Sequence, residues 1–557
     1  MFMRSAKTFV PDALRGLIAS TDDIAWNPDP GYLTRAQPLP RRQVAIVSGG
    51  GSGHEPLHAG FIGAGMLTAV CPGLVFTSPN ALQIHEASKA VDVDGGVLHI
   101  VKNYTGDVLN FGIARELLRE DAIDTDVVLV DDDLASERAD GSGPGRRGTA
   151  ATVVVEKVCG AAAERGDSLA EVVSIGRQVA ESARSMAVAL APCRLPGATE
   201  PSFNLPAGQM ELGIGIHGER GTERVDALPA PELVRRLTDP IIDSLQLVSG
   251  DRVIAVVNGL GATHPLELQL LFAELGEYLD QKGIRIERPL VGTFVTALNM
   301  AGASITLVRV DDQVLELWDA PCSAPAWPNS PARTYSAVGP SGSFGPTYTP
   351  PTTPRDDESA GPWVADWAQK VLDQEPALTD LDRRAGDGDF GTNMVAALEQ
   401  LDLTAIRDSY STSTAFDALS QAYLGHAGGT SGALFGIWFR HFYRAAGHGR
   451  FDLAAVATAA RAGLDNITTL GGARPGDKTM VDAIAPAVEA LEEAVRSGTT
   501  YDAALHQAAN AARAGAESTE AMVAHRGRAS YVGEAARGVI DPGALVIAWF
   551  FECGAGH

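Results

Sequence analysis

A proline-rich stretch divides the sequence into two regions of different pattern. Ten of the chain's 32 prolines fall within residues 321–362, alongside Ser, Thr and Gly. Proline has no backbone N–H to donate, so such a stretch forms no regular ladder and buries little surface. It predicts a linker at 321–362 between a domain at 1–320 and a domain at 363–557. A length of 557 residues also exceeds the usual size of a domain with a single hydrophobic core.

In the first region, short apolar runs alternate with helical patterns. The runs have the length and flanking turn residues of buried strands. They lie at 43–50, 96–104, 126–131, 211–218, 252–258 and 303–310. Helical patterns lie between several of them, at 105–120, 149–165 and 266–282. Strands alternating with helices predict an α/β domain.

The second region has lost the strand pattern and carries Ala-rich segments with apolar residues at helical spacing. Eight helices are predicted, at 363–375, 392–401, 414–424, 431–446, 452–470, 479–497, 501–524 and 542–552. Gly-rich connections separate them. The region therefore predicts an antiparallel helical bundle or barrel.

Charge and cysteine usage narrow the class of protein. The net charge of -25 argues against a nucleic-acid partner, which requires clustered Lys and Arg. Five cysteines without a C-x-x-C pair indicate reduced thiols in a cytoplasm and no zinc site. Residues 1–19 lack the apolar core of a signal peptide, and the longest apolar stretch, 544–551, is too short to span a bilayer. We expect a soluble, cytoplasmic protein with no membrane partner.

Three aspartates crowd the stretch 381–394, namely Asp382, Asp387 and Asp389, with glycines between them. Two like charges about 5 Å apart at an effective dielectric of about 20 repel by roughly 3 kcal/mol, so a folded loop needs a cation there. Oxygen ligands favour Mg²⁺ or Ca²⁺. Counting Asp387 as position one of a calcium loop puts Leu398 where a Glu belongs, so Mg²⁺ with a nucleotide fits better. The alternative is a solvated acidic turn.

Glycine-rich loops at predicted helix ends offer phosphate sites in the second region. The run 428–432, Gly-Gly-Thr-Ser-Gly, precedes a helix whose free N–H groups and dipole favour an anion. It is not a Walker A loop, and an ordinary helix-start turn is the alternative. The loops 471–480 and 527–531, the latter followed by 541–543, are similarly placed. Arg528 could pair with a phosphate, or serve as a solvated helix cap.

In the first region, polar side chains follow three predicted strands. The loop 49–56 presents His54 after a run of glycines, and 102–107 places Asp107 at the carboxyl edge of the sheet. In 211–218, alternation puts three apolar residues on one face and two glycines with His217 on the other, which predicts space for a ligand. The alternatives are structural histidines and a helix-capping aspartate.

Six ordered motifs carry a family resemblance that covers nearly the whole chain. They are Gly-Gly-Gly-Ser-Gly-His-Glu-Pro at 49–56, Lys-Asn-Tyr-Thr-Gly-Asp at 102–107, Gly-Ile-His-Gly at 215–218, Gly-Asp-Gly-Asp at 386–389, Gly-Asp-Lys-Thr-Met at 476–480 and Gly-Arg-Ala-Ser-Tyr at 527–531. With them the chain resembles the single-chain, ATP-dependent dihydroxyacetone kinases. The resemblance implies an α/β K-type domain of two subdomains, a linker, and an all-α L-type domain forming an eight-helix antiparallel barrel.

The resemblance also implies roles for individual residues. His217 would hold the ketose as a covalent hemiaminal, Asp107 would take the proton of the attacking terminal hydroxyl, and His54 would assist. The residues that would line the ketose pocket are Gly51, Ser78, Lys102, Asp107 and His217. The Mg²⁺ ligands would be Asp382, Asp387 and Asp389. The ATP contacts would be Phe390, Gly391, Thr392, Asn393, Ser431, Gly432, Gly471, Met480, Arg528, Asp541, Pro542 and Gly543.

Other activities and a partner follow from the same resemblance. The expected substrate is dihydroxyacetone, and the expected assembly is a homodimer. Phe390 and Arg220 depart from the usual family residues, which leaves a four-carbon ketose such as D- or L-erythrulose open as the substrate. A non-catalytic ketose and ATP sensor, and a lyase that forms cyclic flavin phosphate, are further alternatives found among relatives.

Overall fold

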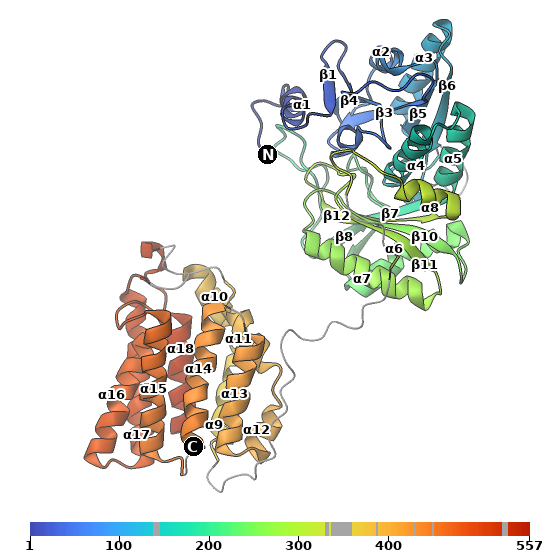
Figure 1. Ribbon diagram of the computed structural model, residues 1–557. Coiled ribbons are helices and arrows are strands. Elements are labelled where there is room, and N and C mark those ends of the chain that lie inside the picture. Colours follow the sequence, from blue (N-terminus) through green and yellow to red (C-terminus); the bar gives the residue numbers. More distant parts are fainter. Residues whose placement is uncertain are drawn as a thin grey trace. The chain divides into compact units, whose positions relative to one another are not determined.

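The chain folds into two compact units, Met1–Gly339 and Pro340–His557, shown in the ribbon of a computed structural model (Figure 1). The structure describes residues 1–137, 145–328, 334–335, 359–385, 388–427, 429–447, 450–525 and 533–557. No helix in these residues combines the length and apolar composition that crossing a membrane requires.

The first unit begins with a mixed six-stranded sheet of order β1-β2-β4-β3-β5-β6. Its strands β3 to β6 pair in parallel, whereas β1 and β2 are antiparallel additions at one edge. The strands are β1 (Ile24–Asn27), β2 (Tyr32–Arg35), β3 (Ala45–Ser52), β4 (Ala69–Val75), β5 (Val97–Lys102) and β6 (Thr125–Val130).

Helices cover both faces of this sheet, so its central strands β3 and β5 are buried along their whole length. Alternate residues of β3 point to opposite cores: Val47 lies with helices α2 and α3, and Ile46 lies with α4 and α5. The helices of this half are α1 (Phe9–Ala19), α2 (Ala81–Val91), α3 (Thr105–Glu120), α4 (Ala151–Arg165) and α5 (Leu169–Glu181).

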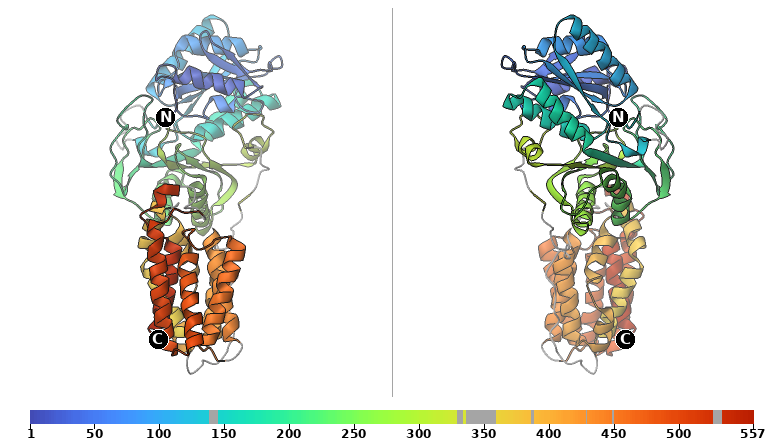
Figure 2. Two further views of the ribbon diagram at one scale, coloured as in Figure 1. Left: turned by 90° about the vertical axis from the view of Figure 1, so that its left-hand side faces the viewer. Right: turned by 90° about the vertical axis from the view of Figure 1, so that its right-hand side faces the viewer.

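A second six-stranded sheet, of order β11-β10-β12-β7-β8-β9, completes the first unit. Helices α6 and α7 cover one of its faces, and the other face shares a core with α4 and α8. Helix α4 therefore lies between the two sheets (Figure 2), and its side chains are buried on nearly all sides. The elements are β7 (Ala183–Ala191), β8 (Gln209–Leu212), β9 (Glu223–Asp226), α6 (Ala230–Leu245), β10 (Arg252–Gly259), α7 (Pro265–Gln281), β11 (Arg285–Gly292), β12 (Ala301–Arg309) and α8 (Asp312–Asp319).

The second unit is a ring of helices around one apolar core. Helices α9, α11, α13, α14, α15, α16, α17 and α18 each contact the next, and α18 contacts α9, so the ring closes. The helices in the described part of this unit are α9 (Gly361–Asp373), α10 (Glu375–Ala385), α11 (Phe390–Leu398), α12 (Leu403–Ser409), α13 (Thr412–His426), α14 (Gly429–Ala446), α15 (Leu453–Gly471), α16 (Val481–Ser497), α17 (Tyr501–Ser518) and α18 (Pro542–Ala555).

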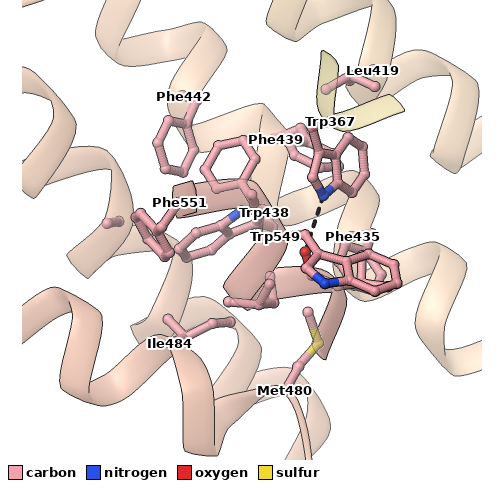
Figure 3. Close-up of a cluster of buried hydrophobic side chains, with 14 of the residues drawn as sticks. Trp367, Leu419, Phe435, Trp438, Phe439, Phe442, Met480, Ile484, Trp549 and Phe551 are labelled. Atoms are coloured by element: carbon pink, nitrogen blue, oxygen red, sulfur yellow. Dashed lines mark hydrogen bonds between the residues drawn. The ribbon is translucent and has the colours of Figure 1, made fainter. Parts of the chain in front are cut away.

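Large aromatic side chains fill the centre of this ring (Figure 3). Trp367, Phe435, Trp438 and Phe439 are completely buried there. The indole N–H of Trp367 donates to the carbonyl of Val546 at 3.0 Å, so its one polar group is satisfied inside the core. This core holds the helix ends that carry the second unit's candidate site.

The predicted α/β domain and all-helical region are both confirmed, but several elements were missed, including two helices of the second unit. Helix α10 is mostly polar and α12 has seven residues, so neither shows a long apolar stripe. Strands β1, β2 and β9 have four residues each, and β4 contains a proline. The predicted strand 211–218 is wrong beyond Leu212, because Gly213 has a φ of +72° and turns the chain.

Part of the predicted linker is ordered. Trp327 packs edge-on against Trp318 with ring centroids 4.9 Å apart, and Ala324 is buried in the first unit's core. Helix α9 begins at Gly361, just before the predicted second domain. The linker boundaries at 321 and 362 stay a prediction, since residues 329–333 and 336–358 lie outside the described part of the chain.

Candidate ketose and nucleotide sites

Four aromatic rings meet at the carboxyl ends of the first sheet's parallel strands. The centroid of the His217 ring lies 4.8 Å from that of His54, 4.5 Å from Tyr104 and 5.3 Å from Phe76. These residues come from segments far apart in the sequence, so the fold brings together the two histidines that the motifs predicted. The edge of an open α/β sheet is where ligands commonly bind.

Glu219 fixes the tautomer of His217. The ring Nδ1 lies 2.9 Å from Glu219 Oε1, and the His217 backbone N–H donates to Oε2 at 2.9 Å. Burial alone would raise the pKa of Glu219, but the hydrogen bond and charge of His217 and the Arg147 guanidinium hold it at about 2. An ionised carboxylate only accepts, so Nδ1 carries a proton, and in the neutral form of the ring Nε2 has the lone pair.

The glycines beside His217 make room for this carboxylate. A Cβ on Gly215 would lie 2.0 Å from Glu219 Oε2 and 2.4 Å from an Arg147 nitrogen. The prediction that they clear space for a ligand is therefore wrong at Gly215. The predicted apolar face is confirmed, because Leu212, Ile214 and Ile216 are all buried.

His54 has the same tautomer for a different reason. Its Nδ1 lies 2.7 Å from the carbonyl oxygen of Thr296, which can only accept, so Nδ1 donates. Its buried Nε2 has no hydrogen-bond partner. Burial, with the neighbouring His217 and Lys102, holds the pKa of His54 well below its usual range, so the ring is neutral. The unpartnered Nε2 is an acceptor for a ligand hydroxyl.

A buried ammonium and a carboxylate complete the group. Lys102 ends β5, Asp107 lies in the first turn of α3, and Lys102 Nζ is 3.9 Å from Asp107 Oδ2. The side chain of Asp107 does not cap α3, whose N-cap residue is Tyr104. Burial lowers the pKa of Lys102, and the Asp107 carboxylate opposes that shift.

Close backbone packing surrounds Gly51, and side-chain hydrogen bonds hold Ser78. Gly51 lies inside β3, and a Cβ there would be 2.5 Å from the Thr77 backbone nitrogen. Ser78 Oγ donates to the Pro79 carbonyl at 3.0 Å and accepts from Asn110 at 3.5 Å. The glycine-rich run is therefore mostly strand rather than the predicted loop, because its glycines let the neighbouring backbone approach.

In the second unit, a cavity of about 180 Å³ opens among the ends of several helices. Most of the predicted nucleotide and metal residues line it, namely Asp382, Asp389, Phe390, Asn393, Ser431, Gly471, Met480, Asp541, Pro542 and Gly543. Asp387 and Arg528 lie outside the described residues. Sequence reasoning missed Thr430, Leu434, Phe435, Lys478 and Thr479, although 476–480 was recognised as a motif.

Three predicted contacts do not line the cavity. A Cβ on Gly391 would lie 2.2 Å from Thr379 Oγ1, and one on Gly432 would lie 2.3 Å from the Ala427 carbonyl. Thr392 Oγ1 donates instead to Glu375 at 3.5 Å. The two glycines allow close helix approach, which explains their residue type without a ligand.

The cavity's acidic groups fit a hard cation. Asp382 accepts the Phe390 N–H at 3.0 Å, and Asp541 accepts the Ala544 N–H at 2.8 Å as the N-cap of α18. Burial raises the pKa of Asp541 to about 7, although the Lys478 ammonium opposes the shift. Within the described residues no three acidic, His or Cys groups form a metal cluster, and the third predicted ligand lies outside them. Oxygen donors of this kind suit Mg²⁺.

Asp482 shapes the loop that closes the cavity. Its two oxygens accept the N–H groups of Gly476 and Thr479, at 2.5 and 2.8 Å. Between them Lys478 has a φ of +61° and donates through Nζ to the Thr519 carbonyl at 2.6 Å. Burial lowers the pKa of Lys478. The loop thus places the buried Lys478 ammonium beside the carboxylates of Asp541 and Asp482. The spacing of residues in the sequence did not indicate this role.

Comparisons with known proteins match a domain family in each of the two units. Residues 15–326 match the Dak1 domain, and residues 384–555 match the DAK2 domain. Triokinase/FMN cyclase of Mus musculus is 38% identical over 571 residues, covering 99% of this chain and 97% of that protein. L-erythrulose 1-kinase of Mycolicibacterium smegmatis is 37% identical, covering 100% of this chain and 99% of that protein.

A solved structure shows the same two-domain architecture. The dihydroxyacetone kinase from C. freundii, in complex with AMP-PNP and Mg²⁺, is 31% identical with a TM-score of 0.62. The match covers 100% of this chain and 99% of that one. An α/β Dak1 domain followed by a helical DAK2 domain defines the class. The chain belongs to the single-chain dihydroxyacetone kinase family.

Proposed function

We propose that the protein is an ATP-dependent kinase that phosphorylates the terminal hydroxyl of a small ketose, with dihydroxyacetone as the first candidate. The single observation that carries this proposal is the carboxylate-backed His217, whose Nε2 is left as a nucleophile beside His54, Tyr104 and Phe76. Neutral imidazole adds to a ketone carbonyl, whereas a polyol without a carbonyl offers it no target.

The proposed capture step follows from the tautomer of His217. A bond forms between Nε2 and the carbonyl carbon, the C=O electron pair moves to oxygen, and that oxygen takes up a proton from solvent water. The ring gains positive charge, which the Glu219 carboxylate stabilises at 2.9 Å from Nδ1. His54 Nε2 accepts a hydrogen bond from a ketose hydroxyl. The product is a hemiaminal that fixes the ketose in one orientation.

Asp107 is the proposed base for transfer. It takes the proton of the terminal hydroxyl as that oxygen bonds to the γ-phosphorus of ATP, and the bond to the leaving ADP oxygen breaks. Lys102, with Gly51 and Ser78, orients the ketose. In the second unit we assign Asp382, Asp387 and Asp389 to Mg²⁺. When bound, the metal neutralises charge on the transferring phosphoryl group.

The nucleotide assignment rests on the cavity at the helix ends. Ser431 lies in the first turn of α14, and the segment 541–543 begins α18, so backbone N–H groups and helix dipoles are available to the phosphates. Arg528 stays a proposed phosphate contact by its motif. Gly391, Thr392 and Gly432 are proposed to shape the site by packing.

A panel of ketoses, read by coupled ADP release, tests the proposal. We expect turnover with dihydroxyacetone and none with glycerol, and His217→Ala should abolish covalent ketose capture while retaining ATP binding. Absence of turnover with dihydroxyacetone and with both erythrulose enantiomers would refute a ketose kinase. A preference for erythrulose would establish the second candidate, which the likeness to L-erythrulose 1-kinase favours.

Two further proposals concern the setting of the enzyme. We infer a homodimer from the family resemblance, which light scattering of the purified protein would test. We also infer a cytoplasmic location, supported by five free cysteines. Localisation of a tagged full-length chain would check it.

A further inference from the structure

A chain of three buried side chains runs inward from the ketose pocket. Lys102 Nζ lies 2.7 Å from His58 Nε2, and His58 Nδ1 lies 2.5 Å from Glu156 Oε1. The residues come from β5, from the segment before Ala59 and from the middle of α4. Their exposures are 1% for Lys102, 4% for His58 and 0% for Glu156, so solvent does not compete for these contacts.

The geometry fixes the direction of each hydrogen bond. An ammonium has no lone pair, so Lys102 donates to His58 Nε2, and His58 Nδ1 must then carry the ring proton toward Glu156. Ser48 Oγ lies 3.0 Å from Nδ1, but its hydroxyl donates to the Ile100 carbonyl at 2.8 Å. The imidazole therefore bridges an ammonium and a carboxyl group as a neutral donor and acceptor.

These buried polar side chains make the folded protein less stable than apolar residues at the same positions would. Glu156 Oε2 is buried without a hydrogen-bond partner. Burial raises the pKa of Glu156 to about 8, against the attraction of Lys102. Buried ion pairs are commonly no more stable than apolar residues of the same volume. A Cβ on Gly50 would lie 2.3 Å from Lys102 Nζ. Strand β3 therefore has a glycine at the position where any side chain would collide with the lysine.

The His58 contact determines which direction remains for Lys102. Of the three ammonium protons, one goes to His58 Nε2 at 2.7 Å and one points toward the Gly49 carbonyl at 3.5 Å. The third is left for the pocket, where Asp107 Oδ2 lies 3.9 Å away, beyond direct hydrogen-bond distance. Without the His58 acceptor, the ammonium would move onto Asp107 and occupy the lone pair that must take the hydroxyl proton.

We propose that His58 and Glu156 are positioning residues of the ketose site, which hold the Lys102 ammonium close to Asp107 without letting it pair directly with that carboxylate. The inference rests on the proposed function and adds two residues that none of the six motifs marks as functional. Glu156 acts through His58, and His58 acts through Lys102.

Glu156→Gln tests the chain with little change in shape. Its amide oxygen still accepts from His58 Nδ1, but the carboxylate charge that Glu156 carries above its pKa of about 8 is gone. At pH 9 we expect kcat with the ketose to fall about tenfold, as for a displaced catalytic group, with KM for ATP unchanged. The matched control is Glu164→Gln on the same helix, where the exposed side chain pairs with Arg35. It should retain wild-type kcat.

A double-mutant cycle separates positioning from a structural role. In a Lys102→Met background, Glu156→Gln should cause no further loss in kcat/KM or in ketose affinity measured by calorimetry, because both act through one ammonium. ¹⁵N-histidine spectra of the full-length protein should show His58 as the Nδ1–H tautomer. A His58→Gln variant adds a second perturbation, and if it does not fold, the Glu156 cycle still decides.

Two results would overturn the inference while the kinase assignment stands. The first is a kcat of Glu156→Gln within twofold of wild type at pH 9, and the second is a loss that persists in full in the Lys102→Met background. An opposite His58 tautomer would do the same. A wild-type protein that turns over no ketose would instead refute the proposed function, and the inference with it.

Discussion

Replacing Glu219 by Gln removes the charge behind the proposed nucleophile and keeps the side chain's size. A glutamate ordinarily has a pKa of about 4.3, so a pKa of about 2 corresponds to roughly 3 kcal/mol of stabilisation of the carboxylate by its surroundings. The side chain is 35% exposed, and Arg147 shares the interaction with His217. Solvent screens the carboxylate, and Arg147 takes part of the interaction, so the energy of the Glu219–His217 interaction is about 1–2 kcal/mol.

That energy predicts a loss in kcat/KM for the ketose of about 5- to 30-fold, because the carboxylate stabilises the charge that the ring gains on capture. Steady-state assays over a range of ketose concentrations at neutral pH measure it, with KM for ATP expected to stay unchanged. Glu223→Gln on β9, where the exposed side chain pairs with Arg236, is the matched control. It should retain the wild-type kcat/KM.

The pH dependence of this contribution has a definite sign. Because folding lowers the pKa of Glu219, its stabilisation is present above the unfolded value of about 4.3 and is lost as pH falls toward 2. Wild-type and Glu219→Gln proteins should therefore converge in stability only as pH falls to about 2, in acid unfolding followed by circular dichroism. An activity of Glu219→Gln within twofold of wild type would refute the argument from the tautomer.

Further perturbations test the other parts of the two sites. Gly50→Ala would place a methyl group 2.3 Å from Lys102 Nζ and should lower ketose kcat/KM at least tenfold, whereas Gly112→Ala, with nothing within 4 Å, should be neutral. Asp541→Asn keeps the cap of α18 but removes a buried charge. At pH 8 with a chelator present, the melting temperature of this variant should therefore be a few degrees above that of wild type. The same variant should gain less stability from Mg-ATP than wild type does, and equal gains would contradict a role at the nucleotide site. Chelation of Mg²⁺ should abolish turnover and the thermal shift caused by ATP, and readdition should restore both.

The sequence predicted the elements with long, regular patterns. Helix α3 was predicted at 105–120 and is observed at Thr105–Glu120. Its bounds were predictable because a strand precedes it directly and its helical pattern is long. The glycine-rich strand segments failed for a physical reason: a glycine can mark a ligand, a turn or a close backbone approach, and the sequence does not distinguish them. At Gly215 the neighbour is a carboxylate of the same loop.

The site was predictable where motifs marked it and not where the fold alone creates it. His54, Asp107 and His217 were identified as separate strand-end residues, and the structure brings the two imidazoles to a centroid distance of 4.8 Å. Thr296 is 242 residues from the His54 it orients, a contact that no local pattern indicates. Lys478 was missed because a buried lysine after a glycine-rich turn has the sequence appearance of a solvated one.

The two pocket imidazoles share a tautomer but not a partner, and this difference supports the roles proposed for them. A carbonyl oxygen behind His54 orients the ring without supplying a full negative charge, and burial keeps that ring neutral. An ionised carboxylate behind His217 orients its ring and also stabilises positive charge on it. Forming a bond through Nε2 makes the ring cationic, whereas accepting a hydrogen bond does not. Nucleophilic capture is therefore favoured at His217, and hydrogen-bond acceptance at His54.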